Sequence, residues 1–148
     1  MNQADDAELA RRVVAHMMSK DAFSRWLGIE VLESRPRGST IRMRVRPEMV
    51  NGFGVAHGGI VFSLADSALA FAANAHGRLT LAVENSISYP APINVGDVLT
   101  ADAIEESGTN RLAFYRVTVT NERDAIVALF KGTVYKTSQE HFPETARS

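Results

Sequence analysis

The sequence predicts a single α+β domain in which a curved antiparallel β-sheet wraps around one long central helix. The first observation is that residues 59–73 are apolar on nearly every side, so a helix formed by them must be covered nearly all round. The second is that strand-like segments make up most of the remaining chain, and a sheet is the cover that they can form. The length of 148 residues suits one compact domain.

The N-terminal part of the chain is predicted to be helical. Within residues 6–18, apolar side chains recur at every fourth position and form an amphipathic stripe: Leu9, Val13 and Met17. Residues 22–26 predict another short turn of helix, which ends at Gly28. We therefore expect residues 1–27 to form an N-terminal helical extension of the domain.

Strand patterns lie on both sides of the central helix. Before it, residues 29–33 and 40–45 are rich in branched side chains and enclose turn residues, which predicts a hairpin. After it, strands are expected at residues 81–88, 98–105, 112–120 and 126–135. The last three of these strands are joined by short turn-rich segments, which predicts an antiparallel meander. The core is expected to span residues 28–137, and the polar residues 138–148 are predicted to be a flexible tail.

Composition narrows the classes of function. The 16 basic and 17 acidic residues give a net charge of -1, and no basic stretch indicates nucleic-acid binding. The absence of cysteine excludes disulfide scaffolds, thiolate zinc sites and cysteine nucleophiles. Asp66 interrupts the apolar helix, which is also shorter than the roughly 20 residues of a membrane span. Residues 1–8 are polar and acidic, unlike a signal peptide, and we expect a cytoplasmic protein with no membrane partner.

The sequence His57-Gly58-Gly59 directly precedes the central helix. The first N–H groups of a helix have no partner within it and lie at the positive end of its dipole, so they can hold an anion or a polarised carbonyl. Glycine also lets a ligand approach the backbone closely. The alternative is an ordinary junction in which these residues only cap the helix.

Polar side chains form a stripe along the central helix at spacings of three and four: Ser63, Asp66, Ser67 and Asn74. A buried carboxylate must be paired, hydrogen-bonded or protonated, so Asp66 is a functional candidate. It can instead be a structural aspartate that a neighbouring serine satisfies. Asn51, followed by Gly52, is first of all a turn signal. A functional role for Asn51 is suggested only by its closeness in the sequence to His57, Gly59 and Asp66.

The run from Asn51 to Ala75, NGFGVAHGGIVFSLADSALAFAANA, resembles the PaaI-like thioesterases, a phenylacetic-acid-degradation type with the hotdog fold. The similarity covers about residues 23–137 and includes SYPAPINVGDVLTADA and AIVALFKGTVYK in the later strands. The combined pattern is specific, whereas no single piece of it is. The resemblance implies a hotdog fold and an enzyme that hydrolyses a short-chain or aromatic, phenylacetyl-type acyl-CoA.

The resemblance also assigns roles to individual residues. Asp66 matches the catalytic aspartate, which attacks the thioester carbonyl or activates water, and Gly59 matches the glycine whose N–H polarises that carbonyl. Asn51 and His57 match polar residues that position the thioester and the attacking group. Ser67 stands where many relatives carry threonine, a hydroxyl that can orient the carboxylate or water. A carboxylate and an oxyanion donor suffice for a thioester, so we expect no metal and no cofactor apart from the coenzyme A of the substrate.

Binding of the substrate requires further residues. The phosphates of coenzyme A favour Arg, Lys or a helix N-terminus, and Arg111 and Lys131 are candidates, although each is equally an ordinary exposed charge. Phe53 and Phe62 are expected to line the acyl pocket. Two other functions fit the same pattern. One is a hotdog dehydratase or hydratase, in which His57 carries the proton. The other is a non-catalytic acyl-CoA sensor.

The spacing of Gly59 and Asp66 predicts an oligomer. On one straight helix these residues are about 10.5 Å apart at 1.5 Å per residue, too far for both to reach one carbonyl group. We therefore expect a homodimer with shared active sites, in which Asp66 works with Gly59 of the partner subunit. The resemblance implies a further pairing of dimers into a homotetramer.

Overall fold

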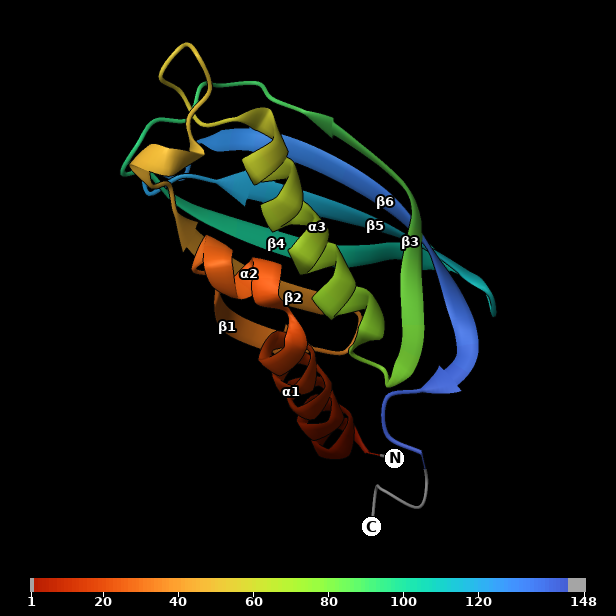
Figure 1. The fold of residues 1–148 in the computed structure, drawn as a ribbon. Coiled ribbons are helices and arrows are strands. Elements are labelled where there is room, and N and C mark those ends of the chain that lie inside the picture. The colour runs from red at the N-terminus through yellow and green to blue at the C-terminus, as the bar shows by residue number, and fades with distance from the viewer. Residues whose placement is uncertain (1, 144–148) are drawn as a thin grey trace.

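The computed structural model describes residues 2–143. In it, a curved antiparallel sheet is folded around one long helix (Figure 1). The helix is α3, Gly58–Asn74. The strands are β1 Glu30–Arg35, β2 Gly38–Arg44, β3 Arg78–Ser88, β4 Val98–Gly108, β5 Leu112–Thr120 and β6 Ile126–Glu140. They make one six-stranded sheet in the order β1-β2-β4-β5-β6-β3, and every neighbouring pair is antiparallel. The predicted fold class is confirmed.

The central helix α3 supplies the middle of the hydrophobic core. Leu64, Leu69 and Phe71 are fully buried, and α3 contacts β2, β3, β4, β5 and β6. Close approach to the sheet requires a glycine at position 132 on β6, because a Cβ there would lie 2.5 Å from Leu69 Cδ2. The sheet therefore covers the apolar surface of α3, as its composition requires.

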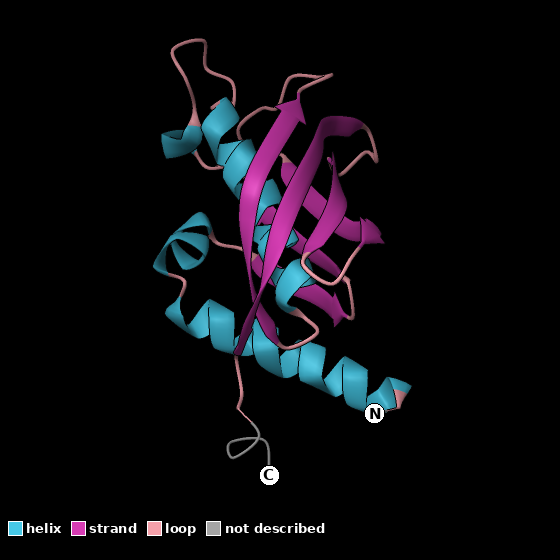
Figure 2. Cartoon of the chain, turned by 90° about the vertical axis from the view of Figure 1, so that its right-hand side faces the viewer, coloured by secondary structure: helices cyan, strands magenta, loops and turns pink. Residues whose placement is uncertain are grey.

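Two helices precede the sheet, α1 Gln3–Lys20 and α2 Ala22–Leu27, and a short 3₁₀ turn follows β2 at Pro47–Met49. The start of α1 lies before the predicted one because Asn2 and Asp5 form a capping box: each side chain accepts a hydrogen bond from the other's backbone N–H. Helix α1 buries Val13 and Val14 and contacts β1 and α3 (Figure 2). The N-terminal extension is thus packed onto the core.

The C-terminal strand is longer than predicted. Residues 138–140 belong to β6, and Glu140 is paired with Arg78 of β3. The predicted start of the tail at Ser138 is therefore wrong, since strand pairing satisfies the backbone of these exposed polar residues. His141 then donates its backbone N–H to the Gly77 carbonyl at 2.8 Å. Residues 144–148 of the predicted tail lie outside the described residues.

Strand β3 lies at one edge of the sheet and is hydrogen-bonded to β6 on its other side. Leu81 and Val83 on this strand are 56% and 61% exposed. An open edge with exposed apolar side chains can pair with another chain. Within residues 2–143, no helix combines the length and hydrophobicity that a membrane crossing needs.

Candidate active site

The loop before α3 is shaped by Asn51. Its backbone N–H donates to the Val55 carbonyl at 2.8 Å, and its side-chain Oδ1 accepts from the Phe53 N–H at 2.8 Å. This is the turn role that Asn-Gly predicts, and Oδ1 is therefore engaged within the loop. Phe53, at the tip of the loop, is 93% exposed. In the single chain this ring faces solvent, and it is not part of the lining of the cavity beside the start of α3.

His57 is the N-cap of α3. Its Nδ1 accepts a hydrogen bond from the Gly59 N–H at 2.9 Å, which places the ring proton of neutral His57 on Nε2. The capping alternative is therefore present in the structure, and it occupies the N–H that the resemblance assigns to the substrate carbonyl. A thioester can reach the Gly59 N–H only when the His57 ring moves aside or shares the donor.

A second contact fixes the start of α3. The Tyr89 hydroxyl, just beyond the end of β3, donates to the Gly58 carbonyl oxygen at 2.6 Å. Next to this contact lies a cavity of about 340 Å³ between the Asn51 loop and the segment after β3. Its lining includes Ala56, Val61 and Pro92. The helix N-terminus therefore borders space that a small acyl group or part of a thioester can enter.

Asp66 lies near the middle of α3, half-buried, and points toward β3. Its Oδ1 accepts a hydrogen bond from Nδ2 of Asn85 at 3.0 Å. Burial raises the pKa of the Asp66 carboxyl above its usual value; the Asn85 hydrogen bond opposes this shift, and the nearby Asp21 carboxylate adds to it. Asp66 is thus a desolvated carboxylate held on one oxygen. This is a suitable state for a nucleophile or a general base.

Asn85 contacts Asp66 and was not among the candidate residues predicted from the sequence. It lies on β3, opposite Gly132 of β6, and it is half-buried in the part of the strand where its immediate neighbours Glu84 and Ser86 are exposed. The alternation of a strand places Asn85 and Ile87 on the same face, toward the core. A polar residue at a core-facing strand position was the signal that could have identified it.

Ser67, next to Asp66 on α3, connects to α2. Its Oγ lies 2.8 Å from Oγ of the buried Ser24, whose hydroxyl lies 2.7 Å from Oδ2 of Asp21. The Asp21 carboxylate can only accept, so Ser24 donates to Asp21 and Ser67 donates to Ser24. The hydroxyl proton of Ser67 is therefore used in the hydrogen bond to Ser24. Its oxygen remains an acceptor that can orient a water molecule.

The other polar residues of the α3 stripe are structural. Ser63 donates to the Gly59 carbonyl within the helix at 2.7 Å. Asn74 binds the start of β3: its Oδ1 accepts from the Thr80 N–H at 2.8 Å, and its Nδ2 donates to the Thr80 carbonyl at 3.0 Å. Oδ1 also lies 2.7 Å from Nε2 of His141. The two ends of the stripe are thus bound to backbone groups of α3 and β3, whereas Asp66 in its middle is bound to the side chain of Asn85.

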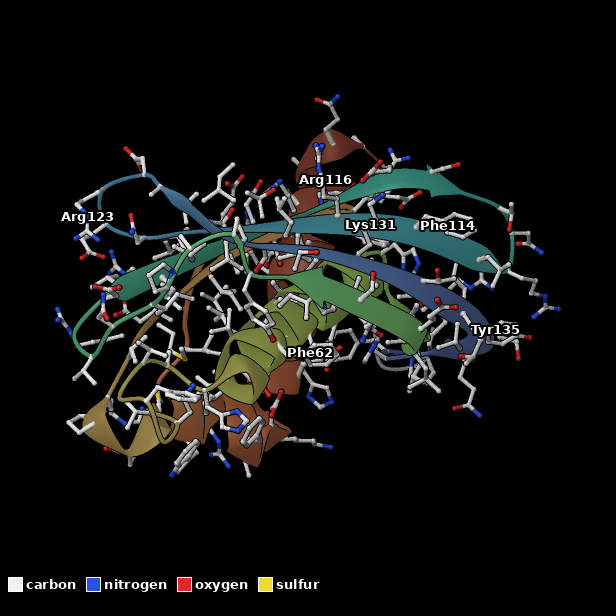
Figure 3. All side chains as sticks on the ribbon, turned by 90° about the horizontal axis from the view of Figure 1, so that it is seen from above. Phe62, Phe114, Arg116, Arg123, Lys131 and Tyr135 are labelled. Carbon is white, nitrogen blue, oxygen red and sulfur yellow. The ribbon has the colours of Figure 1, made fainter. Side chains whose placement is uncertain are left out.

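Of the remaining predicted residues, Phe62 lies near Asp66, whereas Lys131 and Arg111 lie apart from it within one chain. Phe62 is one turn before Asp66 on α3 and packs edge-on against Phe130, with ring centroids 5.4 Å apart. Lys131 is exposed next to the fully buried Phe130, so it projects from the sheet face opposite α3 (Figure 3). Arg111 is exposed in the turn between β4 and β5. The structure brings Asn85 into contact with Asp66. The adjacent Ser67 is turned toward α2, and Gly59 and His57 lie at the start of the same helix.

Comparison with known proteins places this chain in a family. Residues 53–128 match the family model described as the thioesterase superfamily. The acyl-coenzyme A thioesterase PaaI of Escherichia coli is 34% identical over 123 residues, which cover 82% of this chain and 88% of that protein. Acyl-coenzyme A thioesterase 13 of Homo sapiens is 33% identical over 117 residues, covering 76% of this chain and 82% of that protein.

Solved structures agree with these relatives. The E. coli PaaI structure, from the phenylacetic acid degradation operon, has a TM-score of 0.89 and 30% identity, and covers 90% of this chain and 97% of that one. A hypothetical thioesterase from Streptococcus pneumoniae, solved with coenzyme A, has a TM-score of 0.78 and 25% identity, and covers 84% of this chain and 98% of that one. The chain therefore belongs to the thioesterase superfamily, as a PaaI-like thioesterase of the hotdog fold.

Proposed function

We propose that this thioesterase hydrolyses acyl-CoA, with Asp66 as the reacting carboxylate. The observation that carries the proposal is the half-buried Asp66 carboxylate, held on one oxygen by Asn85 and raised in pKa by burial. The names of the E. coli and human relatives, and the coenzyme A in the S. pneumoniae structure, support an acyl-CoA substrate. The cytoplasmic location stays a prediction from the sequence.

The reaction requires only water as a second reactant. In the general-base route, Asp66 takes a proton from water, the water oxygen bonds to the carbonyl carbon, and the C–S bond breaks. The proton held by Asp66 can then pass to the leaving thiolate, so that the products are the acid and the free thiol of CoA. In the nucleophilic route, a carboxylate oxygen of Asp66 bonds to the carbonyl carbon, the C–S bond breaks and the CoA thiolate leaves, which gives a mixed anhydride. Water then hydrolyses the anhydride to the free acid and the Asp66 carboxylate, and the proton released goes to the thiolate. Both routes need a donor for the oxyanion.

That donor is proposed to be the Gly59 N–H of the partner subunit. The open β3 edge, with exposed Leu81 and Val83, is the surface proposed for pairing of the two sheets. A twofold axis there would bring the N-terminus of one α3 toward the middle of the other. Pairing of such dimers into a tetramer, and contact of Arg111 and Lys131 with the CoA phosphates, stay predictions.

The acyl group is proposed to be short or aromatic. The cavity beside the start of α3 holds about 340 Å³, and the aromatic Phe62 lies one turn from Asp66. We expect kcat/KM for phenylacetyl-CoA or a short acyl-CoA to exceed that for palmitoyl-CoA. The measurement is release of free thiol from a panel of short, aromatic and long acyl-CoAs.

Two results of this panel would contradict the proposals. A higher kcat/KM for palmitoyl-CoA than for every short and aromatic ester would overturn the proposed acyl group and leave the reaction intact. No thiol from any ester would overturn the enzymatic function itself, provided that the protein is shown to be folded. A panel run without protein measures the background of spontaneous hydrolysis.

The role of His57 separates hydrolysis from dehydratase chemistry. We expect His57→Ala to lower activity less than Asp66→Ala does, because His57 caps α3 and positions the thioester but does not transfer a proton in the reaction. Loss of the cap is expected to lower the free energy of unfolding by about 1 kcal/mol, which urea unfolding measures. His57→Asn is the matched control, since asparagine is also a good N-cap. An activity loss in both variants as large as that of Asp66→Ala would favour proton transfer by His57.

A further inference from the structure

The side-chain amide of Asn85 lies between α3 and the sheet, where a hydrogen bond to Asp66 holds it. Its Nδ2 donates to Asp66 Oδ1 at 3.0 Å across the gap between β3 and α3. Its Oδ1 is buried and has no hydrogen-bond partner within the described part of the chain. A buried amide oxygen without a partner destabilises a fold, so such a group calls for an explanation.

The packing around Asn85 shows that space is kept for this amide. A Cβ at Gly132 on the neighbouring strand would lie 2.7 Å from Asn85 Oδ1 and 2.5 Å from Leu69 Cδ2. Gly132 is itself buried in the middle of β6, where glycine weakens a strand. The chain therefore combines two unfavourable features, a strand glycine and an unpaired amide oxygen, at the point where an Nδ2–H reaches Asp66.

We propose that Asn85 is a positioning residue of the thioesterase reaction, which holds Oδ1 of Asp66 and leaves Oδ2 as the oxygen that reacts. This inference rests on the proposed function of Asp66. A carboxylate on a helix can rotate about its terminal bond, and a hydrogen bond to one oxygen fixes the plane of the group. The other oxygen then points in one direction, toward water or the thioester carbon.

The same hydrogen bond keeps Asp66 reactive. Burial favours the protonated carboxyl, which is neither a nucleophile nor a base, whereas a donor to the carboxylate favours the ionised form. Asn85 therefore opposes the effect of burial without bringing a charge into the site. A lysine or arginine at this position would lower the pKa of Asp66 further and weaken it as a base.

The test compares Asn85→Ala and Asn85→Asp with the wild type by the pH dependence of kcat and kcat/KM. For Asn85→Ala, loss of a hydrogen bond to a charged group is expected to lower kcat about 10- to 100-fold at neutral pH, with KM little changed. Its acid limb should move to higher pH, because the pKa of Asp66 rises when the donor is removed. For Asn85→Asp the limb should move further, since two adjacent carboxylates cannot both ionise readily.

Two controls separate this role from a structural one. Ser86→Ala changes the next residue of β3, which is exposed, and should leave kcat and the acid limb unchanged. Asp66→Ala tests the proposed function itself: if it stays active, that function fails. If Asp66→Ala is inactive while both Asn85 variants keep the wild-type kcat and acid limb, only the positioning role fails. A lower thermal stability with an unshifted acid limb would assign Asn85 to the fold alone.

Discussion

Replacing Asp66 with alanine or asparagine is expected to abolish turnover of acyl-CoA while the fold stays intact. Alanine removes the carboxylate and keeps a good helix former, and the amide of asparagine is neither a comparable nucleophile nor a base. Loss of general-base catalysis typically lowers kcat about 10²- to 10⁴-fold. The measurement is steady-state thiol release by both variants, with far-ultraviolet circular dichroism to show that the helices are retained.

The Asp66→Asn substitution is also expected to stabilise the protein at neutral pH. Burial raises the pKa of Asp66 in the folded chain above its value in the unfolded chain. The folded state therefore binds this proton more tightly, and stability is lost as the pH rises through the raised pKa. Asp66→Asn removes the buried charge, so its Tm at pH 7 should exceed that of the wild type. The difference should disappear below about pH 3.9, the ordinary pKa of an aspartate.

These two measurements distinguish a functional aspartate from a structural one. A reacting carboxylate in a desolvated site commonly costs stability, so activity falls and stability rises when it is removed. A structural aspartate would show the reverse, with near-normal kcat and a lower Tm at pH 7. The hydrogen bond from Asn85 is retained in Asp66→Asn, because the amide oxygen of asparagine can accept it. A loss of Tm in this variant at neutral pH would contradict the interpretation.

The sequence predicts the fold well because the signals for its elements are local. An apolar helix, a hairpin and a meander each have their own periodicity and turn residues, and the structure contains all of them. The errors lie at the ends of elements. The capping box of Asn2 and Asp5 extends α1 toward the N-terminus, and pairing with β3 extends β6 to Glu140. The second of these depends on a partner distant in the sequence, which periodicity cannot detect.

The site was predictable only in part for the same reason. Asp66 is conspicuous because it is a carboxylate in an apolar helix, and His57-Gly58-Gly59 is conspicuous because it precedes that helix. Asn85 could be noticed as a polar residue at a core-facing strand position, but its contact with Asp66 is known only once the fold places β3 against α3. The sequence also left open whether His57 caps the helix or faces a ligand. In the single chain it caps the helix and occupies the Gly59 N–H.

The location of Asp66 and Gly59 on one continuous helix predicts that two subunits share each active site. Both lie in α3, Gly58–Asn74, about 10.5 Å apart along its axis at 1.5 Å per residue. An oxyanion donor must lie roughly 3 Å from the oxygen, and the attacking group must be similarly close to the carbonyl carbon. A site completed by the partner subunit resolves this mismatch. Variants that damage either residue should then complement each other.

Gly59→Pro is the variant that removes the donor with the least disturbance. Within residues 2–143, the Gly59 N–H bonds to the His57 side chain and to no backbone carbonyl. Proline is tolerated in the first turn of a helix. Gly59→Ala is the matched control, because it keeps the N–H. Its Cβ would lie 3.0 Å from His57 Nδ1, an atom of a side chain that can shift. We expect Gly59→Pro to be inactive and Gly59→Ala to remain active.

Mixing the inactive Asp66→Ala and Gly59→Pro proteins, followed by dissociation and reassociation, is expected to restore activity. In a mixed dimer, Asp66 of the Gly59→Pro chain would meet Gly59 of the Asp66→Ala chain, so one site would be intact and the other would carry both lesions. Each mixed dimer should therefore show about half of the wild-type activity. If both groups of a site came from one subunit, every site would keep a lesion and mixing would restore nothing. Mass spectrometry of differently tagged chains measures subunit exchange, and complete exchange without recovered activity would exclude the shared site.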